Sequence, residues 1–344
     1  AVYRESSDKA DFLEHVARKL QSVYVPALYE VTYDDDGTIS SFRPKKKGVP
    51  HKIQRSVVTD LASCDTCTTI LTPYTEFESA FLVEIGRGCS HGCRFCAAGY
   101  VYRPPRLRSS DALKKSLATG TDRADRIGLV GAAVSDLPGI GPICKEALDR
   151  GVRISFSSLR ADSISEEVAD VLKKSRDKTA TLAPDAGSER LRRVINKGIT
   201  EEDLLNATDL LVSRGIPNIK LYFMVGLPTE THDDVKEIVD LCKRVKHRFL
   251  KTSRGKKRIG NITVSLNCFV PKPHTPFQWT SFEEIRSLKE KIKLVKDGLK
   301  KVANVRVHGD IPKWAYIQAL LSRGDRRVAG LLEMVHHNNG NLSL

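Results

Sequence analysis

Residues 84–106 read EIGRGCSHGCRFCAAGYVYRPPR, and Cys89, Cys93 and Cys96 fall within this stretch with the spacing C-x3-C-x2-C. The chain has 8 cysteines among 344 residues. At that frequency the triplet is expected by chance only about 0.004 times per chain, whereas a C-x2-C pair is expected about 0.2 times. The triplet therefore indicates a site, while the pair Cys64 and Cys67 is weak evidence for one.

Three clustered thiols fit some kinds of site better than others. A disulfide would use two cysteines and leave the third unpaired. A structural zinc ion needs four ligands, usually in two separated pairs, and His91 would reach such an ion only with difficulty from inside the same tight loop. A [4Fe–4S] cluster is normally held by four thiolates, so three would leave one iron open to a further ligand. The spacing favours this cluster, with zinc as the alternative.

Outward from this loop, short apolar runs alternate with amphipathic helical stretches. The runs are residues 80–86, 126–133, 152–158, 178–184, 218–225 and 261–268. Strands that are almost continuously apolar are typical of parallel sheets buried on both faces. The alternation predicts an α/β fold, a parallel (β/α)6 partial TIM-type barrel. An open doubly wound sheet is the alternative.

Three regions follow from this pattern. Residues 1–77 contain an amphipathic helix, a hairpin and a basic linker, residues 78–280 form the barrel, and residues 281–344 form a C-terminal helical extension with a short strand. Because the sequence starts with Ala1 and ends abruptly, we expect it to be a piece of a longer protein, truncated within the extension.

Small, polar and proline-containing segments follow every predicted strand. In a parallel βα barrel the active-site residues gather at the C-terminal ends of the strands. In chain order the segments are the cysteine loop, Gly131–Ala133, Ser157–Ser158, Pro184–Ser188, Gly226–Glu230 and Val270–Trp279. One such segment would be ordinary turn chemistry, but six on one face predict a site.

The composition limits the class of protein. Its 40% hydrophobic and 28% charged residues are typical of a soluble globular protein, and neither a membrane-spanning run nor a signal-peptide pattern is present. Eight scattered cysteines form no secreted disulfide framework, so we expect a reducing cytoplasm.

The net charge of +14 is uneven, because nine of the sixteen residues 243–258 are Lys or Arg. Nucleic acid is a candidate partner for this stretch. No aromatic-rich stacking platform accompanies it, so a solvated helix end is favoured.

The residues of the cysteine loop resemble a known family. A C-x3-C-x-aromatic-C motif after the first strand of a βα barrel is similar to the motif of the radical S-adenosylmethionine (SAM) enzymes. The resemblance covers residues 78–280 and implies a [4Fe–4S] cluster on Cys89, Cys93 and Cys96, with SAM as the second cofactor. It also implies reductive cleavage of SAM to a 5′-deoxyadenosyl radical that abstracts hydrogen from a substrate. A reductant such as flavodoxin or ferredoxin would supply the electron.

The same resemblance implies residues that contact SAM. Phe95 and Met224 would lie near the adenine. The segment containing Gly131 and Ala132 would receive the amino group through backbone carbonyls, since the carboxylate common in relatives is absent here. Ordinary packing is the alternative role for Phe95 and Met224.

Further implied contacts involve the ribose and the SAM carboxylate. Ser157 and Asp185 stand where polar groups of relatives contact the ribose, and Lys197 stands where many relatives place an arginine for the carboxylate. Capping and surface charge are the alternative roles. Cys268 ends the sixth strand on the same face, where core packing is its expected role.

Several other segments resemble bacterial radical SAM proteins of the MiaB and HemN type. They are VYVPALYEVTYDDDGTI, INKGIT, FVPKPHTPFQW and ALLSRGDRR. Many such proteins carry an upstream cobalamin-binding domain. Residues 1–77 are too short for that domain, so cobalamin and methyl transfer would come through a domain outside this sequence.

Two alternative functions are kept. A tRNA methylthiotransferase-like enzyme would use the basic stretch, although that family's additional cluster domain and RNA-binding module are not found in the sequence. A non-catalytic Fe–S binding or electron-transfer protein would be atypical with three cysteines in a large barrel. The sequence itself identifies no substrate.

Overall fold

The computed structural model describes residues 2–255 and 259–340, and the chain divides into two compact units, Ala1–Asp60 and Leu61–Leu344. In the first unit, the Asp8 side chain accepts a hydrogen bond from the Asp11 amide at 2.9 Å and so caps helix α1 (Lys9–Lys19). Strands β1 (Tyr29–Tyr33) and β2 (Ile39–Pro44) pair as an antiparallel hairpin. This unit contains the helix and the hairpin that the sequence predicts.

The second unit contains all six predicted barrel strands. They are β3 (Phe81–Glu84), β6 (Arg126–Val130), β7 (Arg153–Phe156), β8 (Thr179–Asp185), β9 (Asn218–Val225) and β10 (Ile262–Cys268). The helices between and after them are α2 (Ser110–Thr121), α3 (Ile140–Asp149), α4 (Glu166–Lys174), α5 (Glu189–Val194), α6 (Glu201–Ser213), α7 (His232–Thr252) and α8 (Ile285–Leu299). Strand β11 (Val305–Gly309) and helices α9 (Pro312–Arg323) and α10 (Val328–His337) follow.

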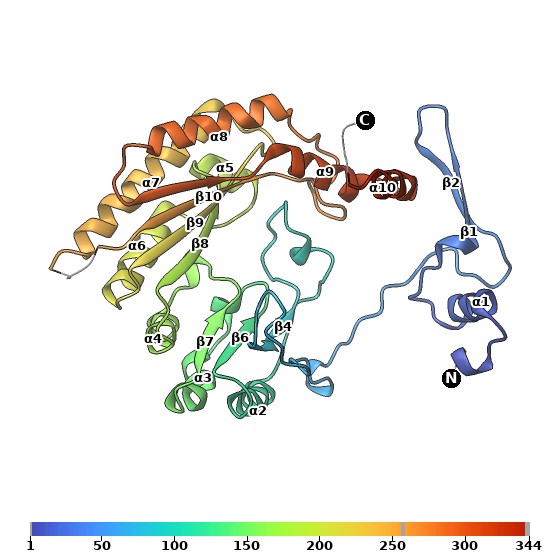
Figure 1. Ribbon diagram of the computed structural model, residues 1–344, viewed down its shortest axis with the longest axis horizontal. Helices are drawn as coiled ribbons and strands as arrows, with labels where there is room; N and C mark the ends of the chain where they lie inside the picture. The colour runs from blue at the N-terminus through green and yellow to red at the C-terminus, as the bar shows by residue number, and fades with distance from the viewer. Residues whose placement is uncertain (1, 256–258, 341–344) are drawn as a thin grey trace. The chain divides into compact units, whose positions relative to one another are not determined.

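The strands form two parallel sheets whose order follows the sequence. One sheet has the order β3-β6-β7 and the other β8-β9-β10-β11. Within the described residues no ladder joins β7 to β8 or β11 to β3. Figure 1 shows the two sheets with helices α2 to α8 on their outer side. The fold is therefore the predicted α/β partial barrel. Strand β11, which the sequence placed in a C-terminal extension, adds a seventh strand by pairing in parallel with β10.

Alternating side chains on these strands face the helices or the barrel interior. On β9, Ile219, Leu221 and Phe223 are buried in the core cluster, whereas Lys220 and Tyr222 between them are half-buried. The main core thus lies between the strands and the outer helices. The opposite face of the strands is left to polar and small residues, which positions them for function.

Chain segments outside the barrel also support it. Residues 66–68 pair antiparallel with the free edge of β3, through hydrogen bonds from Thr68 to Leu82 and from Glu84 to Thr66, each of 3.0 Å. This covers an edge strand that would otherwise expose unpaired backbone groups.

In the described part of the chain, no helix is both long and apolar enough to cross a lipid bilayer.

Candidate active site

The three cysteines lie on a loop that two short strands close at its base. Strands β4 (Gly86–Arg87) and β5 (Arg106–Leu107) pair antiparallel. The loop of residues 88–105 therefore begins and ends at neighbouring positions just after β3. Inside this loop, a Cβ atom on Gly99 would come within 2.5 Å of the His91 carbonyl oxygen. Only glycine allows the loop to fold back on itself this closely around the cysteines.

The loop is fixed to two neighbouring segments by hydrogen bonds. The Arg94 amide donates to the Ile195 carbonyl at 2.9 Å, and the Phe277 amide donates to the Arg94 carbonyl at 3.3 Å. The Gly92 carbonyl accepts from the Asn196 side chain and from the Tyr100 hydroxyl, each at 2.8 Å. The segments after α5 and after β10 therefore hold the loop at the C-terminal ends of the strands.

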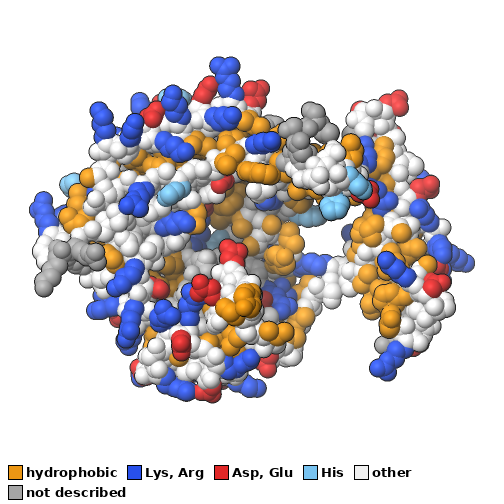
Figure 2. Space-filling model, in the orientation of Figure 1, with side chains coloured by type: hydrophobic (Ala, Val, Ile, Leu, Met, Phe, Trp, Pro, Cys, Tyr) orange, Lys and Arg blue, Asp and Glu red, His pale blue; other side chains and the backbone are white. Residues whose placement is uncertain are grey.

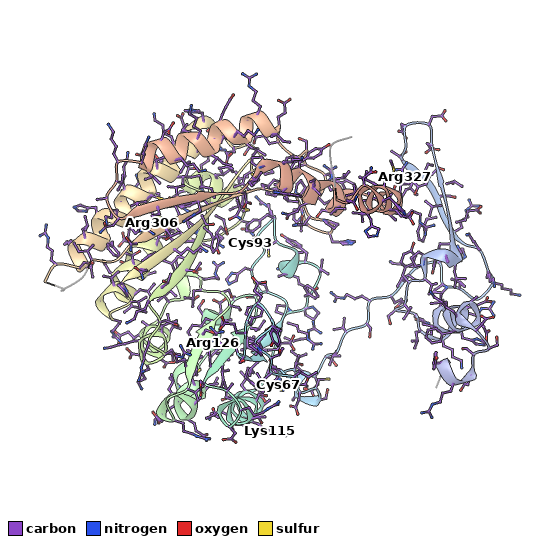
Figure 3. All side chains as sticks on the ribbon, viewed as in Figure 1. Cys67, Cys93, Lys115, Arg126, Arg306 and Arg327 are labelled. Atoms are coloured by element: carbon purple, nitrogen blue, oxygen red, sulfur yellow. The ribbon has the colours of Figure 1, made fainter. Side chains whose placement is uncertain are left out.

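All three loop cysteines are free thiols, with Cys93 buried and Cys89 and Cys96 half-buried. Figure 3 shows Cys93 beside the β8–β11 sheet and Cys67 well away from it. Among the described residues, no group of three Cys, His, Asp or Glu side chains that could hold a single metal ion is found. A [4Fe–4S] cluster makes a different demand, because each thiolate binds a different iron and the sulfurs surround the cluster. The donor set fits such a cluster.

Two cationic side chains lie close to Cys93. Burial raises the pKa of the Cys93 thiol, and the neighbouring Lys197 and Arg160 oppose that rise. Arg160 is buried, donates to the Lys197 carbonyl at 3.1 Å and pairs with Asp162 at 2.7 Å. The positive charge of these side chains would help to hold a thiolate-bound, anionic group next to Cys93.

Asp185 and Lys197 are brought together in the same place. The Lys197 ammonium donates to the Asp185 carboxylate at 2.5 Å, and both side chains are buried. Burial raises the pKa of Asp185, while Lys197 opposes the rise. Asp185 also has a φ of 64° where the β8–β9 register shifts. A non-glycine residue in this strained region is common at functional sites.

Gly131 and Ser157, which follow β6 and β7, contact each other directly. The Ser157 hydroxyl donates to the Gly131 carbonyl at 3.0 Å, and the Gly131 amide donates back to the hydroxyl at 3.2 Å. Ser158 donates to the same carbonyl at 3.0 Å. Both lone pairs of the Gly131 carbonyl are thus engaged by hydroxyls, whereas the adjacent Ala132 is exposed.

Phe95 and Met224 pack against one small hydrophobic cluster. Its buried members are Ala186, Leu191, Ile195, Leu227, Phe269 and Phe277. These residues come from the loops and helix that follow β8, β9 and β10. The cluster therefore places the aromatic side chain of the cysteine loop next to the fifth barrel strand, where both residues were expected to lie near the adenine.

Asp136 and Arg160, which the sequence analysis did not identify, also belong to this face, as does His91, considered there only as a zinc ligand. His91 pairs with Asp136 at 2.6 Å, which ties the cysteine loop to the segment after β6. Arg160 was overlooked, although a charged residue soon after the predicted strand 152–158 was a usable signal. The pairing of His91 with a residue forty-five positions away left no signal in the sequence.

Most of the described basic stretch is neutralised or buried by the protein itself. Arg244 binds Glu201 at 2.6 Å and Glu237 at 3.1 Å, Arg248 binds Asp209 at 2.7 Å, and Lys246 is buried. Residues 256–258 of this stretch lie outside the described residues. Figure 2 shows basic and acidic side chains interspersed over the face of the molecule in view.

The chain is similar to several known proteins. Residues 83–242 match the model of the Radical SAM superfamily. The chain is 40% identical over 259 residues to an uncharacterized protein of Methanocaldococcus jannaschii, covering 75% of this chain and 55% of that protein. It is 25% identical over 204 residues to a tRNA-2-methylthio-N(6)-dimethylallyladenosine synthase of Carboxydothermus hydrogenoformans, covering 55% and 46%.

Among solved structures, coproporphyrinogen III oxidase (HemN) from Escherichia coli, described as a radical SAM enzyme, is 14% identical. The two superpose with a TM-score of 0.46, over 64% of this chain and 52% of that one. The present chain spans about half the length of the curated relatives above.

Proposed function

Because residues 83–242 match the model of the Radical SAM superfamily, we propose that this chain binds a [4Fe–4S] cluster through Cys89, Cys93 and Cys96 and cleaves SAM reductively. In this superfamily the cluster, when bound, supplies the electron that converts SAM to methionine and a 5′-deoxyadenosyl radical. That radical would abstract a hydrogen atom from the substrate. The observation that carries the proposal is the loop of three free thiols, docked on the face where the other implied SAM contacts gather.

The chain's own residues would divide the work of holding SAM. Phe95 and Met224 offer an apolar wall for the adenine. The segment of Gly131 and Ala132 offers a backbone carbonyl for the amino group, and this falls to Ala132 because the Gly131 carbonyl already accepts from Ser157 and Ser158. The buried pair of Asp185 and Lys197 offers an acceptor for ribose hydroxyls and a donor for the carboxylate.

Shielding from water supports the same proposal. Cys93, Asp185 and Lys197 are all buried, with no more than about a tenth of each residue exposed. Electrostatic contacts are stronger in such a site, and a reactive intermediate is protected from side reactions. A site of this kind suits radical chemistry better than simple electron transfer, which needs no such chamber.

A tRNA methylthiotransferase-like activity is the second candidate, favoured by the likeness to a tRNA-2-methylthio-N(6)-dimethylallyladenosine synthase. The basic stretch lends it little support, because Arg244 and Arg248 are engaged by acidic residues of the same chain. A cobalamin-dependent methyl transfer would require a domain beyond these residues. The proposal is therefore a radical SAM enzyme with a substrate still to be identified and an external reductant.

The cluster assignment is tested with Cys89→Ala/Cys93→Ala/Cys96→Ala and the control Cys64→Ser/Cys67→Ser. After anaerobic reconstitution with iron and sulfide, we expect the control to retain wild-type iron content and the triple variant to lose it. The wild type and the control should form 5′-deoxyadenosine from SAM and dithionite, and the triple variant should not. Retention of a full cluster by the triple variant would refute the assignment, and S-adenosylhomocysteine as the product would indicate methyl transfer.

A further inference from the structure

The interior face of the β8–β11 sheet carries cationic and hydroxyl side chains in adjacent positions. The parallel register aligns Lys220 on β9, Thr263 on β10 and Arg306 on β11 in one row. The next interior row aligns Tyr222, Ser265 and His308. Neighbouring strands lie about 4.8 Å apart, so the two hydroxyls on β10 lie between a lysine on one side and an arginine and a histidine on the other.

The face to which these side chains belong follows from the alternation of burial along the strands. Val264 and Leu266 on β10 are buried in the core cluster, and Val305 and Val307 on β11 pack against that cluster. The intervening residues must therefore project from the opposite face, toward the interior. Lys220 lies with its ammonium 4.7 Å from the centre of the Tyr222 ring, along the same face.

Among the described residues, the cations on this face form no ion pair with a carboxylate, and Lys220 contacts only the ring of Tyr222. Within the described residues, no hydrogen bond or ion pair is made by the side chain of Lys220, Arg306 or His308. By contrast, Arg214 and Arg244 on the outer helices each pair with two carboxylates. Unpaired cations that converge from neighbouring strands are typical of a surface that binds an anion.

The interior is also open enough to admit a ligand. In a closed eight-stranded barrel, bulky branched side chains fill the interior. Here several interior positions hold small residues, including Gly128, Ser155, Thr181, Ala183, Thr263 and Ser265. A cavity of about 320 Å³ lies beside this face, lined by residues of β7 and β8 and by Asp177; of the two interior rows, only Tyr222 lines it. This volume suits part of a small molecule.

We propose that the interior face of the β8–β11 sheet binds an anionic group, a phosphate or a carboxylate, of a small-molecule substrate through Lys220, Arg306 and His308. The inference rests on the proposed function, since it places the substrate below the SAM site. Arg306 and Cys93 lie toward opposite ends of this sheet (Figure 3). An anion held over Thr263 and Ser265 would leave the other end of the substrate directed toward the cysteine loop. The chain thereby gains a way to orient its substrate before hydrogen abstraction.

The test measures anion binding directly, on anaerobically reconstituted protein at low ionic strength. Calorimetric titration with pyrophosphate and with citrate probes the phosphate and carboxylate forms of the ligand. We expect at least one to bind the wild type in the millimolar range or tighter. Lys220→Ala/Arg306→Ala should weaken that binding by about tenfold or more, as expected for the loss of charged hydrogen bonds.

Two further variants separate this site from general charge and from folding. Lys289→Ala/Lys293→Ala removes two exposed charges from α8 and should bind the anion as the wild type does. Thr263→Val/Ser265→Ala keeps every charge and should still weaken binding. Lys220→Ala/Arg306→Ala should keep the iron content and the SAM binding of the wild type. A failure of the cluster assignment would appear in those two measurements, and a failure of the anion site would appear in the anion titration.

Three outcomes would overturn the inference. If the wild type binds neither pyrophosphate nor citrate, the inference is wrong. It is also wrong if Lys289→Ala/Lys293→Ala weakens anion binding as much as Lys220→Ala/Arg306→Ala does. Tighter binding of a single-stranded oligoribonucleotide than of either small anion, lost in the same variant, would replace the small molecule with RNA.

Discussion

At the scale of single residues, the buried pair of Asp185 and Lys197 links stability to ligand binding. Removing Lys197 alone leaves a buried carboxylate unpaired, which typically costs about 3–5 kcal/mol of folding free energy. Lys197→Ala should therefore lower the urea midpoint and also weaken SAM binding. Lys197→Ala/Asp185→Asn removes the unpaired charge and should recover much of the midpoint.

The double variant, compared with Asp185→Asn alone, decides what Lys197 does. We expect its SAM affinity, measured by calorimetry on the reconstituted protein, to stay at least tenfold below that of Asp185→Asn. If the affinity lies within about threefold of Asp185→Asn, the ammonium serves only Asp185 and does not reach the SAM carboxylate.

Another single residue, Asp177, makes stability depend on pH. Burial raises its pKa to about 6, and Arg153 and Arg126 partly oppose the rise. Because this value lies above the ordinary pKa of about 3.9, the folded state holds the proton more tightly. Stability is therefore lost as the pH rises through the interval between the two values. Asp177→Asn should raise the urea midpoint at pH 8 and raise it about half as much at pH 5.

A control of opposite sign exists in Asp149. Hydrogen bonding to Lys145 lowers the pKa of this exposed carboxyl. Asp149→Asn should bring no gain at pH 8. If Asp177→Asn leaves the urea midpoint unchanged at pH 8, the two arginines offset the cost of burying the ionised carboxylate.

At the scale of secondary-structure elements, the basic half of α7 serves to attach this helix to α6. Arg244 forms a two-point contact with Glu201 at the start of α6. Removing it should leave two carboxylates of the chain without their partner. Arg244→Ala is therefore expected to lower the urea midpoint without changing RNA affinity. Arg254 lies in the same stretch and forms no ion pair among the described residues. Arg254→Ala should therefore change neither the urea midpoint nor the RNA affinity.

Filter binding with a tRNA and a random-sequence RNA of equal length gives the measurement. Phosphate contacts would appear as an affinity that falls steeply with salt, and we expect only weak binding of both RNAs. Tight, tRNA-selective binding that is lost in Arg244→Ala would instead assign the stretch to RNA recognition and favour the methylthiotransferase alternative.

At the scale of the whole barrel, the site depends on the division of the strands into two sheets. Strands β7 and β8 are not joined by a ladder in the described residues, and a cavity lies between them. Strand β11 extends the second sheet and contributes Arg306 and His308 to its interior face. The arrangement thus leaves room for a ligand below the SAM-binding loops, where a closed barrel would have side chains.

The sequence by itself determined the six barrel strands, their parallel order and the identity of the cysteine loop. These features are encoded locally, in runs of apolar residues and in a spacing of thiols too improbable to be accidental. The family resemblance of the sequence also implied Phe95, Asp185, Lys197 and Met224; in the structure Asp185 and Lys197 form a pair, and Phe95 and Met224 pack against one hydrophobic cluster.

Only the tertiary structure decided which groups meet. The pairing of His91 with Asp136, the approach of Arg160 to Cys93, and the register that aligns Lys220 with Arg306 all join residues far apart in the chain. The same holds for β11, whose short run could not reveal its partner strand. Such contacts depend on the curvature and pairing of the sheets, which no local pattern of residues encodes.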